Sequence, residues 1–280
     1  MAGNGLPAAP LARTMRPMSP CPARVSSPTI VLAGLTALIL LSSAPCGAAT
    51  SSSDSTSHVP LLTLTRGDAW YWLGAGVAIG GTAFADLKVR ERALTWDSQG
   101  AQDLATVARQ VPLVAGAAVV LGYVGGRAFD RPDLADASRR IGISMAVVAV
   151  ATEVIKWPVG RVRPEESDKE ADNYQPFSGH DSFPSGHTSL SFAWATAVDR
   201  ETKAGWVPWV VYPLASLVGW SRIRDDKHWA SDVVAGAALG GWGAWKTEDY
   251  LRARDGANSQ SELGLSTSGG APMFVVRVTF

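Results

Sequence analysis

Cysteine and histidine are scarce in this chain of 280 residues. The two cysteines, Cys21 and Cys46, lie near the N-terminus, so the rest of the chain has no cysteine nucleophile, no cysteine-ligated metal site and no internal disulfide. Four histidines in all argue against a multi-histidine metal site. Net charge is lacking too, because 25 basic and 25 acidic residues cancel. We therefore expect no multi-histidine metal site and no nucleic-acid partner.

Apolar residues, in contrast, are plentiful. They make up 46% of the chain, enough for a large core, and the length suggests one sizeable domain with extensions. The mean hydropathy of +0.08 is low for a protein in which every helix faces lipid.

The N-terminal region has the layout of a secretory signal. A basic region with three arginines and no acid precedes the apolar run Ile30–Leu41, and small residues follow up to Thr50. We predict a signal peptide with its basic leader over residues 1–49, cleaved near Ala48 or Ala49. An uncleaved anchor is the alternative, although the run is short for a full span. A Ser-rich linker is predicted over residues 50–64.

Residues 65–255 are predicted to form a helical domain. The fold class is all-α, a six-helix bundle, and residues 256–280 are predicted to add a short C-terminal β-hairpin with strands Glu262–Thr267 and Met273–Phe280. The helices are expected over the apolar runs Trp70–Ala85, Val111–Gly126, Ile141–Ile155, Leu190–Val198, Trp206–Trp220 and Val233–Trp245. Polar loops are expected between them, over Asp86–Asp103, Arg127–Arg140, Lys156–Ser182, Asp199–Gly205 and Ser221–Ser231. Three glycine pairs at i,i+4 spacing predict close helix contacts: Gly76 with Gly80, Gly122 with Gly126, and Gly236 with Gly240.

The segment Ser221–Asp232 carries the first sign of chemistry. Its Arg222 offers a planar positive charge for an anion. If His228 begins a helix, Asp232 lies one turn further on the same face, where its carboxylate can accept the proton of one ring nitrogen and leave the other free to attack. Taken alone, the segment could equally be solvated surface.

Two further segments have chemistry that suits the same ligand. In the segment Lys156–Pro164 (KWPVGRVRP), Lys156 and Arg163 lie where the third helix is expected to end. The alternative to a ligand site is that these basic residues only stabilise the helix C-terminus through its dipole. Phe183–Ser189 (FPSGHTS) precedes the fourth helix. There Ser185 can cap the helix, Gly186 lets a ligand approach the backbone, and first-turn N–H groups form a phosphate cradle beside His187. A simple turn is the alternative for this segment.

Together the three segments predict an anion site at one side of the bundle. They supply three cations, Lys156, Arg163 and Arg222, and two histidines. Three cations in one pocket are costly unless an anion lies among them. Two histidines beside that anion suit one nucleophile and one general acid.

These segments resemble the signature of the type 2 phosphatidic acid phosphatase superfamily, which also contains class A acid phosphatases, lipid phosphate phosphatases and vanadium haloperoxidases. Its motifs are KxxxxxxRP, PSGH and SRxxxxxHxxxD, which match here at Lys156–Pro164, Pro184–His187 and Ser221–Asp232. All signature positions are filled and in order, and three spaced motifs are far more specific than one. Outside Lys156–Asp232 the resemblance rests on helix count.

The resemblance implies a role for each matching residue. His228 would be the nucleophile that forms a phosphohistidine, Asp232 would orient it, and His187 would protonate the leaving oxygen and then activate water. Phosphoryl oxygens would be held by Lys156, Arg163, Ser185, Gly186 and Arg222. The resemblance implies no metal and no other cofactor. His180 and Asp181 lie outside the signature, as loop residues at the entrance.

The sequence thus predicts a metal-independent phosphatase that cleaves a phosphate ester or diphosphate, with a phosphorylated lipid as the leading substrate class. An exported acid phosphatase of broad specificity is the alternative, followed by a vanadate-dependent haloperoxidase and a non-catalytic envelope scaffold. The expected location is the cell envelope, in the periplasm or at the periplasmic face of the inner membrane. Most apolar runs are shorter than the roughly 20 residues of a span. A polytopic inner-membrane protein therefore stays the second model for the location.

Overall fold

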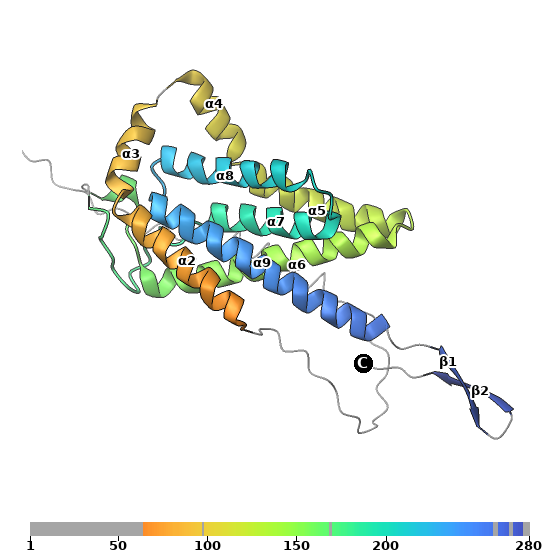
Figure 1. Ribbon diagram of the computed structural model, residues 1–280. Helices are drawn as coiled ribbons and strands as arrows, with labels where there is room; N and C mark the ends of the chain where they lie inside the picture. The colour runs from red at the N-terminus through yellow and green to blue at the C-terminus, as the bar shows by residue number, and fades with distance from the viewer. Residues whose placement is uncertain (1–63, 97, 168–169, 260–262, 269–270, 277–280) are drawn as a thin grey trace, which may run out of the picture.

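The computed structural model describes residues 64–96, 98–167, 170–259, 263–268 and 271–276. The predicted signal peptide and nearly all of the predicted linker lie outside these residues. The described chain is mainly helical (Figure 1). Its helices are α2 (Arg66–Ala83), α3 (Asp86–Thr95), α4 (Gln99–Ala108), α5 (Val111–Ala128), α6 (Pro132–Val159), α7 (Gly186–Thr202), α8 (Pro208–Arg224) and α9 (Ala230–Ser259), with a 3₁₀ turn at Pro164–Glu166.

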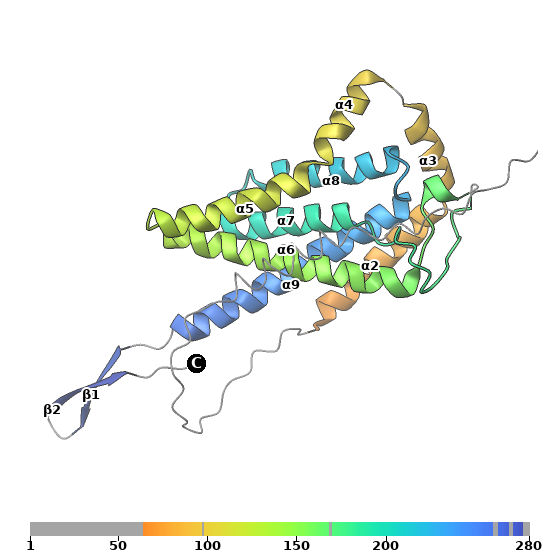
Figure 2. The ribbon, with the colours of Figure 1, turned by 180° about the vertical axis from the view of Figure 1, so that it is seen from behind.

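All six predicted helices are present, as α2, α5, α6, α7, α8 and α9. The expected loop Asp86–Asp103 was wrong, because it contains α3 and the first half of α4, and these two helices form an arm beside α8 (Figures 1 and 2). The expected loop Arg127–Arg140 was too long, since α6 already begins at Pro132. Proline suits this first helical position because its missing N–H would have no partner there.

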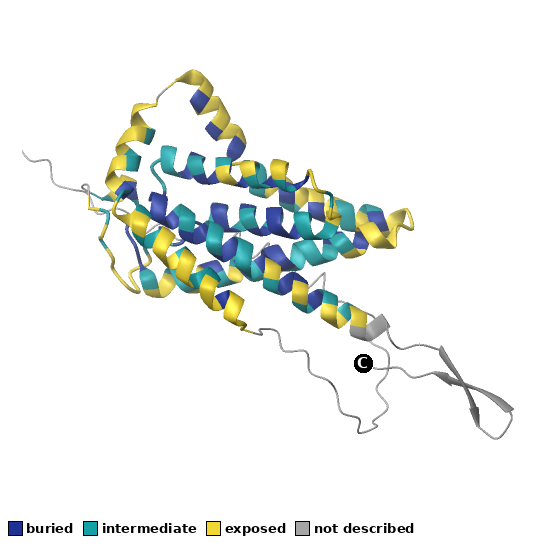
Figure 3. Ribbon diagram, viewed as in Figure 1, coloured by how far each residue is buried: buried dark blue, intermediate teal, exposed yellow. Residues whose placement is uncertain are grey.

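Helix α7 lies at the centre of the bundle and contacts α5, α6, α8 and α9. Figure 3 shows it mostly buried or half-buried, whereas α2, α4 and α5 are largely exposed. Small residues allow the close packing of α7 on α9. A Cβ added to Gly236 would lie 2.6 Å from the carbonyl oxygen of Ser185, so the two backbones approach too closely for a larger side chain.

The predicted glycine contacts are therefore partly confirmed. On α5, a Cβ at Gly126 would lie 2.6 Å from the backbone nitrogen of Ala135 on α6. The pair Gly76 and Gly80 was interpreted wrongly, because neither has a described atom within 4 Å of such a Cβ.

The tail forms two antiparallel strands, β1 (Leu263–Ser268) and β2 (Ala271–Val276), with Leu263 opposite Val276. The expected packing role of this segment stays a prediction.

Large apolar side chains are exposed on several outer helices. Examples are Trp70 on α2, Leu121 on α5, Val154 on α6 and Trp209 on α8, with exposed fractions between 66% and 81%. Two stretches are long and apolar enough to cross a membrane, Gln99–Ala128 and Pro132–Val159, and only 22% of the residues in the most apolar part of each are buried.

An ion-pair network closes the end of the bundle where α7 ends. Arg140 of α6 donates two hydrogen bonds of 2.8 Å to Glu201, and Arg252 of α9 donates a third. Glu248 is fully buried beside this network and accepts a 2.9 Å hydrogen bond from Ser144. The network ties α6, α7 and α9 together at this end.

Candidate active site

The three predicted segments meet at the opposite end of the bundle. Lys156 lies in the last turn of α6, Gly186 is the first residue of α7, and Arg222 lies in the last turn of α8. A Cβ at Gly186 would lie 3.3 Å from the Lys156 Nζ. Glycine at this position thus avoids a tight contact with the ammonium group.

His228 is 4% exposed and lies in the turn before α9. Its Nδ1 is 2.7 Å from the backbone carbonyl oxygen of Ser182. Because a carbonyl only accepts, Nδ1 carries the proton and Nε2 keeps its lone pair. Burial, as the main cause, lowers the pKa of His228 below 6.5. The lowered pKa favours the neutral imidazole, which is the form that can act as a nucleophile.

The sequence predicted that Asp232 accepts the His228 proton directly, but the structure does not show this hydrogen bond. The Asp232 Oδ2 lies 3.9 Å from Nδ1 and instead accepts hydrogen bonds from the Ser182 hydroxyl (2.6 Å) and the Trp229 N–H (2.9 Å). The fully buried carboxylate thus caps the start of α9 and holds Ser182, whose carbonyl in turn holds His228.

His187 lies in the first turn of α7 and is half-buried. Burial, and then the positive charges of Arg222, Lys156 and Arg163 together with His228, lower its pKa from 6.5 to about 3. All three cationic side chains of the site thus act on His187. An anion among the cations would counter them and favour protonation of His187.

Each cation of the site also has a carboxylate beside it. Lys156 donates to Glu153 at 2.9 Å and Arg222 to Asp225 at 3.2 Å. Arg163 donates two hydrogen bonds, of 2.8 and 2.9 Å, to Asp181, a residue expected only at the entrance.

The Nε of Arg222 is buried and, among the described residues, has no hydrogen-bond acceptor. An unpaired buried donor is costly, so an oxygen of a bound ligand would stabilise it.

Ser185 occupies the N-cap position of α7 with an extended backbone, but its side chain does not cap the helix as predicted. Its hydroxyl oxygen accepts a 2.9 Å hydrogen bond from Thr188, and its N–H donates to the Asp232 carbonyl. The first N–H groups of a helix have no carbonyl partner within the helix, and a capping side chain would have taken one of them. They can therefore act as the predicted phosphate cradle.

Sequence reasoning missed two charged residues behind this site. Arg161 and Asp86 are both almost completely buried, and Arg161 donates to Asp86 and to Asp232. Arg161 lies within the first motif segment between Gly160 and Val162, but nothing in the local pattern indicates burial. Asp86 lies in the segment that had been predicted as a loop.

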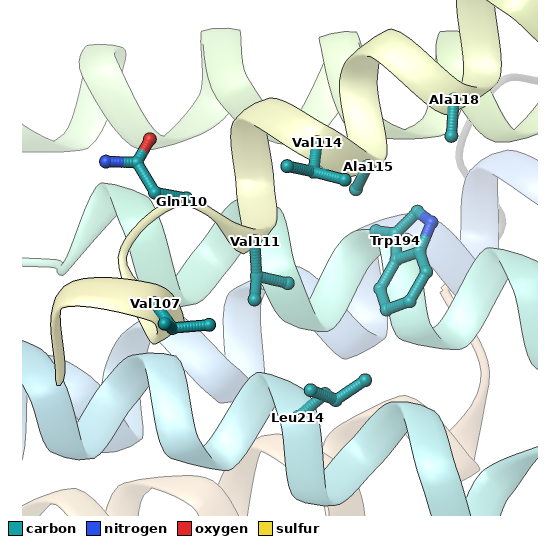
Figure 4. Close-up of a pocket in the computed structure, with 8 residues that line it drawn as sticks. All are labelled: Val107, Gln110, Val111, Val114, Ala115, Ala118, Trp194 and Leu214. Atoms are coloured by element: carbon teal, nitrogen blue, oxygen red, sulfur yellow. The ribbon is translucent and has the colours of Figure 1, made fainter. Parts of the chain in front are cut away.

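An apolar cavity of about 420 Å³ lies between α4, α5, α7 and α8, further along the bundle (Figure 4). No predicted catalytic residue lines it. Trp194 on α7 forms part of its wall and is seven residues beyond His187, roughly 10 Å along the helix axis. The lining residues are Val107, Gln110, Val111, Val114, Ala115, Ala118, Trp194 and Leu214.

No group of three or more histidine, cysteine, aspartate or glutamate residues in the described part of the chain could hold a metal ion. Independence from metals stays a prediction.

Comparison with known proteins links these residues to a family. The family model described as PAP2 superfamily matches residues 138–252, which include every predicted site residue. A lipid A 1-phosphatase of Porphyromonas gingivalis is 33% identical over 159 residues, covering 55% of this chain and 32% of the relative. An undecaprenyl-diphosphatase of Sulfolobus acidocaldarius is 32% identical over 110 residues, covering 38% and 52%. The chain thus spans about a third to a half of the length of these relatives.

A solved structure has a similar fold. The transmembrane PAP2 type phosphatidylglycerolphosphate phosphatase of Bacillus subtilis matches with a TM-score of 0.50 and 19% identity, over 68% of this chain and 94% of that chain. The predicted helical fold class is confirmed by this similarity.

Proposed function

We propose that this chain, whose residues 138–252 match the PAP2 superfamily model, is a phosphatase that removes phosphate from a phosphorylated or diphosphorylated lipid. The observation that carries the proposal is the arrangement around Arg222. Its buried Nε has no acceptor among the described residues, and Arg222 lies with two other cations and two histidines, both with lowered pKa values, at the N-terminus of α7. Such a group of donors suits a phosphoryl dianion and its transition state.

In the first step of the proposed reaction, the His228 Nε2 lone pair attacks phosphorus and forms an N–P bond. The P–O bond to the leaving group breaks, and its electron pair stays on the oxygen, which takes a proton from His187. In the second step neutral His187 removes a proton from water, whose oxygen attacks phosphorus and breaks the N–P bond. Phosphate leaves, and both histidines return to their starting states.

The cations hold the phosphoryl oxygens throughout. Arg163 and Arg222 supply donors from the loop and from α8, and Lys156 supplies one beside Gly186. The dianion also counters the positive charges that lower the pKa of His187, so that this residue is protonated when its proton is needed.

A lipid is favoured over a small phosphate ester for two reasons. The cavity between α4, α5, α7 and α8 has an almost entirely apolar lining, which suits an acyl or prenyl chain. The relatives named above are a lipid A 1-phosphatase and an undecaprenyl-diphosphatase. The exposed apolar side chains and the two candidate spans support a place in or against a membrane, for which we propose the cell envelope.

Phosphate release from purified protein tests the proposal. The substrates are phosphatidic acid, a polyprenyl diphosphate and p-nitrophenyl phosphate, without added metal and with a chelator. We expect release from a lipid substrate, and a loss of about a thousandfold or more in His228→Ala because the nucleophile is gone. His180→Ala is the matched control, since His180 contacts Glu166 in the loop and should keep wild-type activity.

Three other results would contradict the mechanism or support a different function. Wild-type phosphate release in His228→Ala contradicts the mechanism. A strong preference for p-nitrophenyl phosphate supports an acid phosphatase of broad specificity. Halide oxidation that depends on vanadate, without phosphate release, supports a haloperoxidase.

A further inference from the structure

We propose that Arg161 and Asp86 are positioning residues for the phosphohistidine step, acting on His228 through Asp232 and Ser182. This inference rests on the proposed function, because it assigns a task within that reaction.

Arg161 is held on every side by described residues. One of its terminal nitrogens donates to Asp232 at 2.5 Å and to the Ser231 hydroxyl at 2.7 Å, and the other donates to Asp86 at 2.8 Å. Its side chain is 2% exposed, and its guanidinium carbon lies 5.2 Å from the Tyr174 ring centre and 5.5 Å from that of Trp229. A planar group fixed in this way cannot change its direction, so it also fixes the Asp232 oxygen that it contacts.

Asp86 continues this chain of contacts to the start of α3. Its oxygens accept from the Ser231 N–H at 2.9 Å, from the Ser231 hydroxyl at 2.6 Å and from Arg161. Asp86 thus ties α3 to the first turn of α9, directly beside Asp232. The continuous path runs Asp86, Arg161, Asp232, Ser182, His228.

The charges along this path favour the proposed intermediate. With both carboxyl groups ionised, Asp86, Asp232 and Arg161 together carry one negative charge. When the Nε2 lone pair of His228 forms the N–P bond, the imidazole ring becomes positive, because Nδ1 keeps its proton. The charges of the two carboxylates, Arg161 and the positive imidazole ring then sum to zero. A carboxylate in a low-dielectric interior stabilises such a developing charge without needing to touch it.

The cations of the site act on the ring in the opposite direction. Arg163 and Arg222 disfavour a positive imidazole, as their influence on the pKa of His228 shows. Asp232 therefore counters the positive charges of the cations that bind the phosphoryl group. Because Arg161 cancels the charge of one carboxylate, the charge of Asp86 keeps these three buried residues negative in total.

The experiment compares Asp86→Asn with wild type, using kcat and KM for phosphatidic acid, vanadate affinity, the rate of phosphoenzyme formation after rapid quenching, and Tm. Asparagine keeps the acceptor for the Ser231 N–H but removes the charge. We expect kcat and the rate of phosphoenzyme formation to fall by roughly tenfold or more. KM and vanadate affinity should change little, since Lys156, Arg163 and Arg222 are unchanged.

Arg161→Lys and Arg161→Met form the second arm. Lysine keeps the charge but cannot bridge both carboxylates, whereas methionine removes both functions. We expect kcat to follow the order wild type, lysine, methionine. Asp172→Asn, an exposed carboxylate in the neighbouring loop, is the matched control and should keep wild-type kcat.

Two results would overturn the positioning role. One is a wild-type kcat in Asp86→Asn while His228→Ala is inactive. The other is an equal loss of kcat, vanadate affinity and Tm, which would make Asp86 a structural residue only. An inactive wild-type protein would instead remove the proposed function itself, so the two failures can be told apart.

Discussion

At the scale of single residues, Asp181 competes with the proposed substrate. Its carboxylate accepts hydrogen bonds from the Nε and from one terminal nitrogen of Arg163 and lies 4.0 Å from the Lys156 ammonium. These are the donors that a phosphoryl group would use. A substrate must therefore share them with Asp181 or displace it.

Asp181→Asn tests this competition. Because the amide is neutral and is a weaker acceptor, we predict that phosphate and vanadate bind several-fold more tightly than to wild type. Titration with vanadate, followed by inhibition of p-nitrophenyl phosphate hydrolysis, measures the change. Asp172→Asn serves again as the exposed control. Weaker vanadate binding would show instead that Asp181 holds Arg163 in position.

Some contacts between residues of the site could be predicted from the sequence, and others could not. The motif spacing predicted that Lys156, His187, Arg222 and His228 meet, and the structure brings them together. It could not predict that Asp181 pairs with Arg163, because such a contact depends on the path of a loop. The local pattern around Arg161 likewise does not indicate burial.

At the scale of elements, the cavity exists because α4 and α5 diverge at Gln110 above α7 and α8 (Figure 4). Its exposed rim includes Ala118, whereas Ala115 is part of the core. A large side chain at Ala118 can therefore fill the cavity without disturbing the core.

We predict that Ala118→Trp lowers kcat/KM for phosphatidic acid several-fold and leaves p-nitrophenyl phosphate hydrolysis unchanged, because only the lipid needs space for a chain. Ala117→Trp is the matched control, since Ala117 is exposed on the same helix but does not line the cavity. Equal effects of Ala118→Trp on both substrates would contradict a lipid-chain site.

The sequence predicted six of the helices but missed α3 and α4, for a physical reason. Apolar runs identify helices that bury a face, and all six such helices are present. Helix α3 (DLKVRERALT) has few apolar residues but consists mainly of strong helix formers, while Ser98 caps α4 by accepting from the Ala101 N–H at 3.2 Å. Propensity and capping, rather than hydropathy, would have identified these two helices.

At the scale of the whole molecule, the two ends of the bundle carry different electrostatic features. The end with the proposed active site gathers cations, whereas the other end contains the paired network around Glu201 and the buried Glu248. Burial, and then the neighbouring Glu201, raise the pKa of Glu248 from 4.5 to about 8. Glu248 lies in α9, outside the two candidate spans.

The raised pKa makes stability depend on pH. The folded chain holds a proton on Glu248 that the unfolded chain releases near pH 4.5. The resulting stabilisation is complete below pH 4.5 and is lost as pH rises through about 8. We predict that Glu248→Gln raises Tm by several degrees at pH 8 and leaves it nearly unchanged at pH 4.5. Thermal unfolding across this range, with Glu91→Gln as the exposed control, measures the effect. An equal shift of Tm at both pH values would contradict it.

The contact between Asp86 and Ser231 joins residues 145 positions apart in the chain. A ribosome that adds about 5–20 residues per second needs roughly 7–30 s to pass from one to the other. The cations of α6 and its following loop emerge during that interval, and the proposed nucleophile and its supporting carboxylate emerge only at the end. A ribosome that stops before His228 therefore releases a chain that has most of the anion-binding residues and no group to attack the phosphorus.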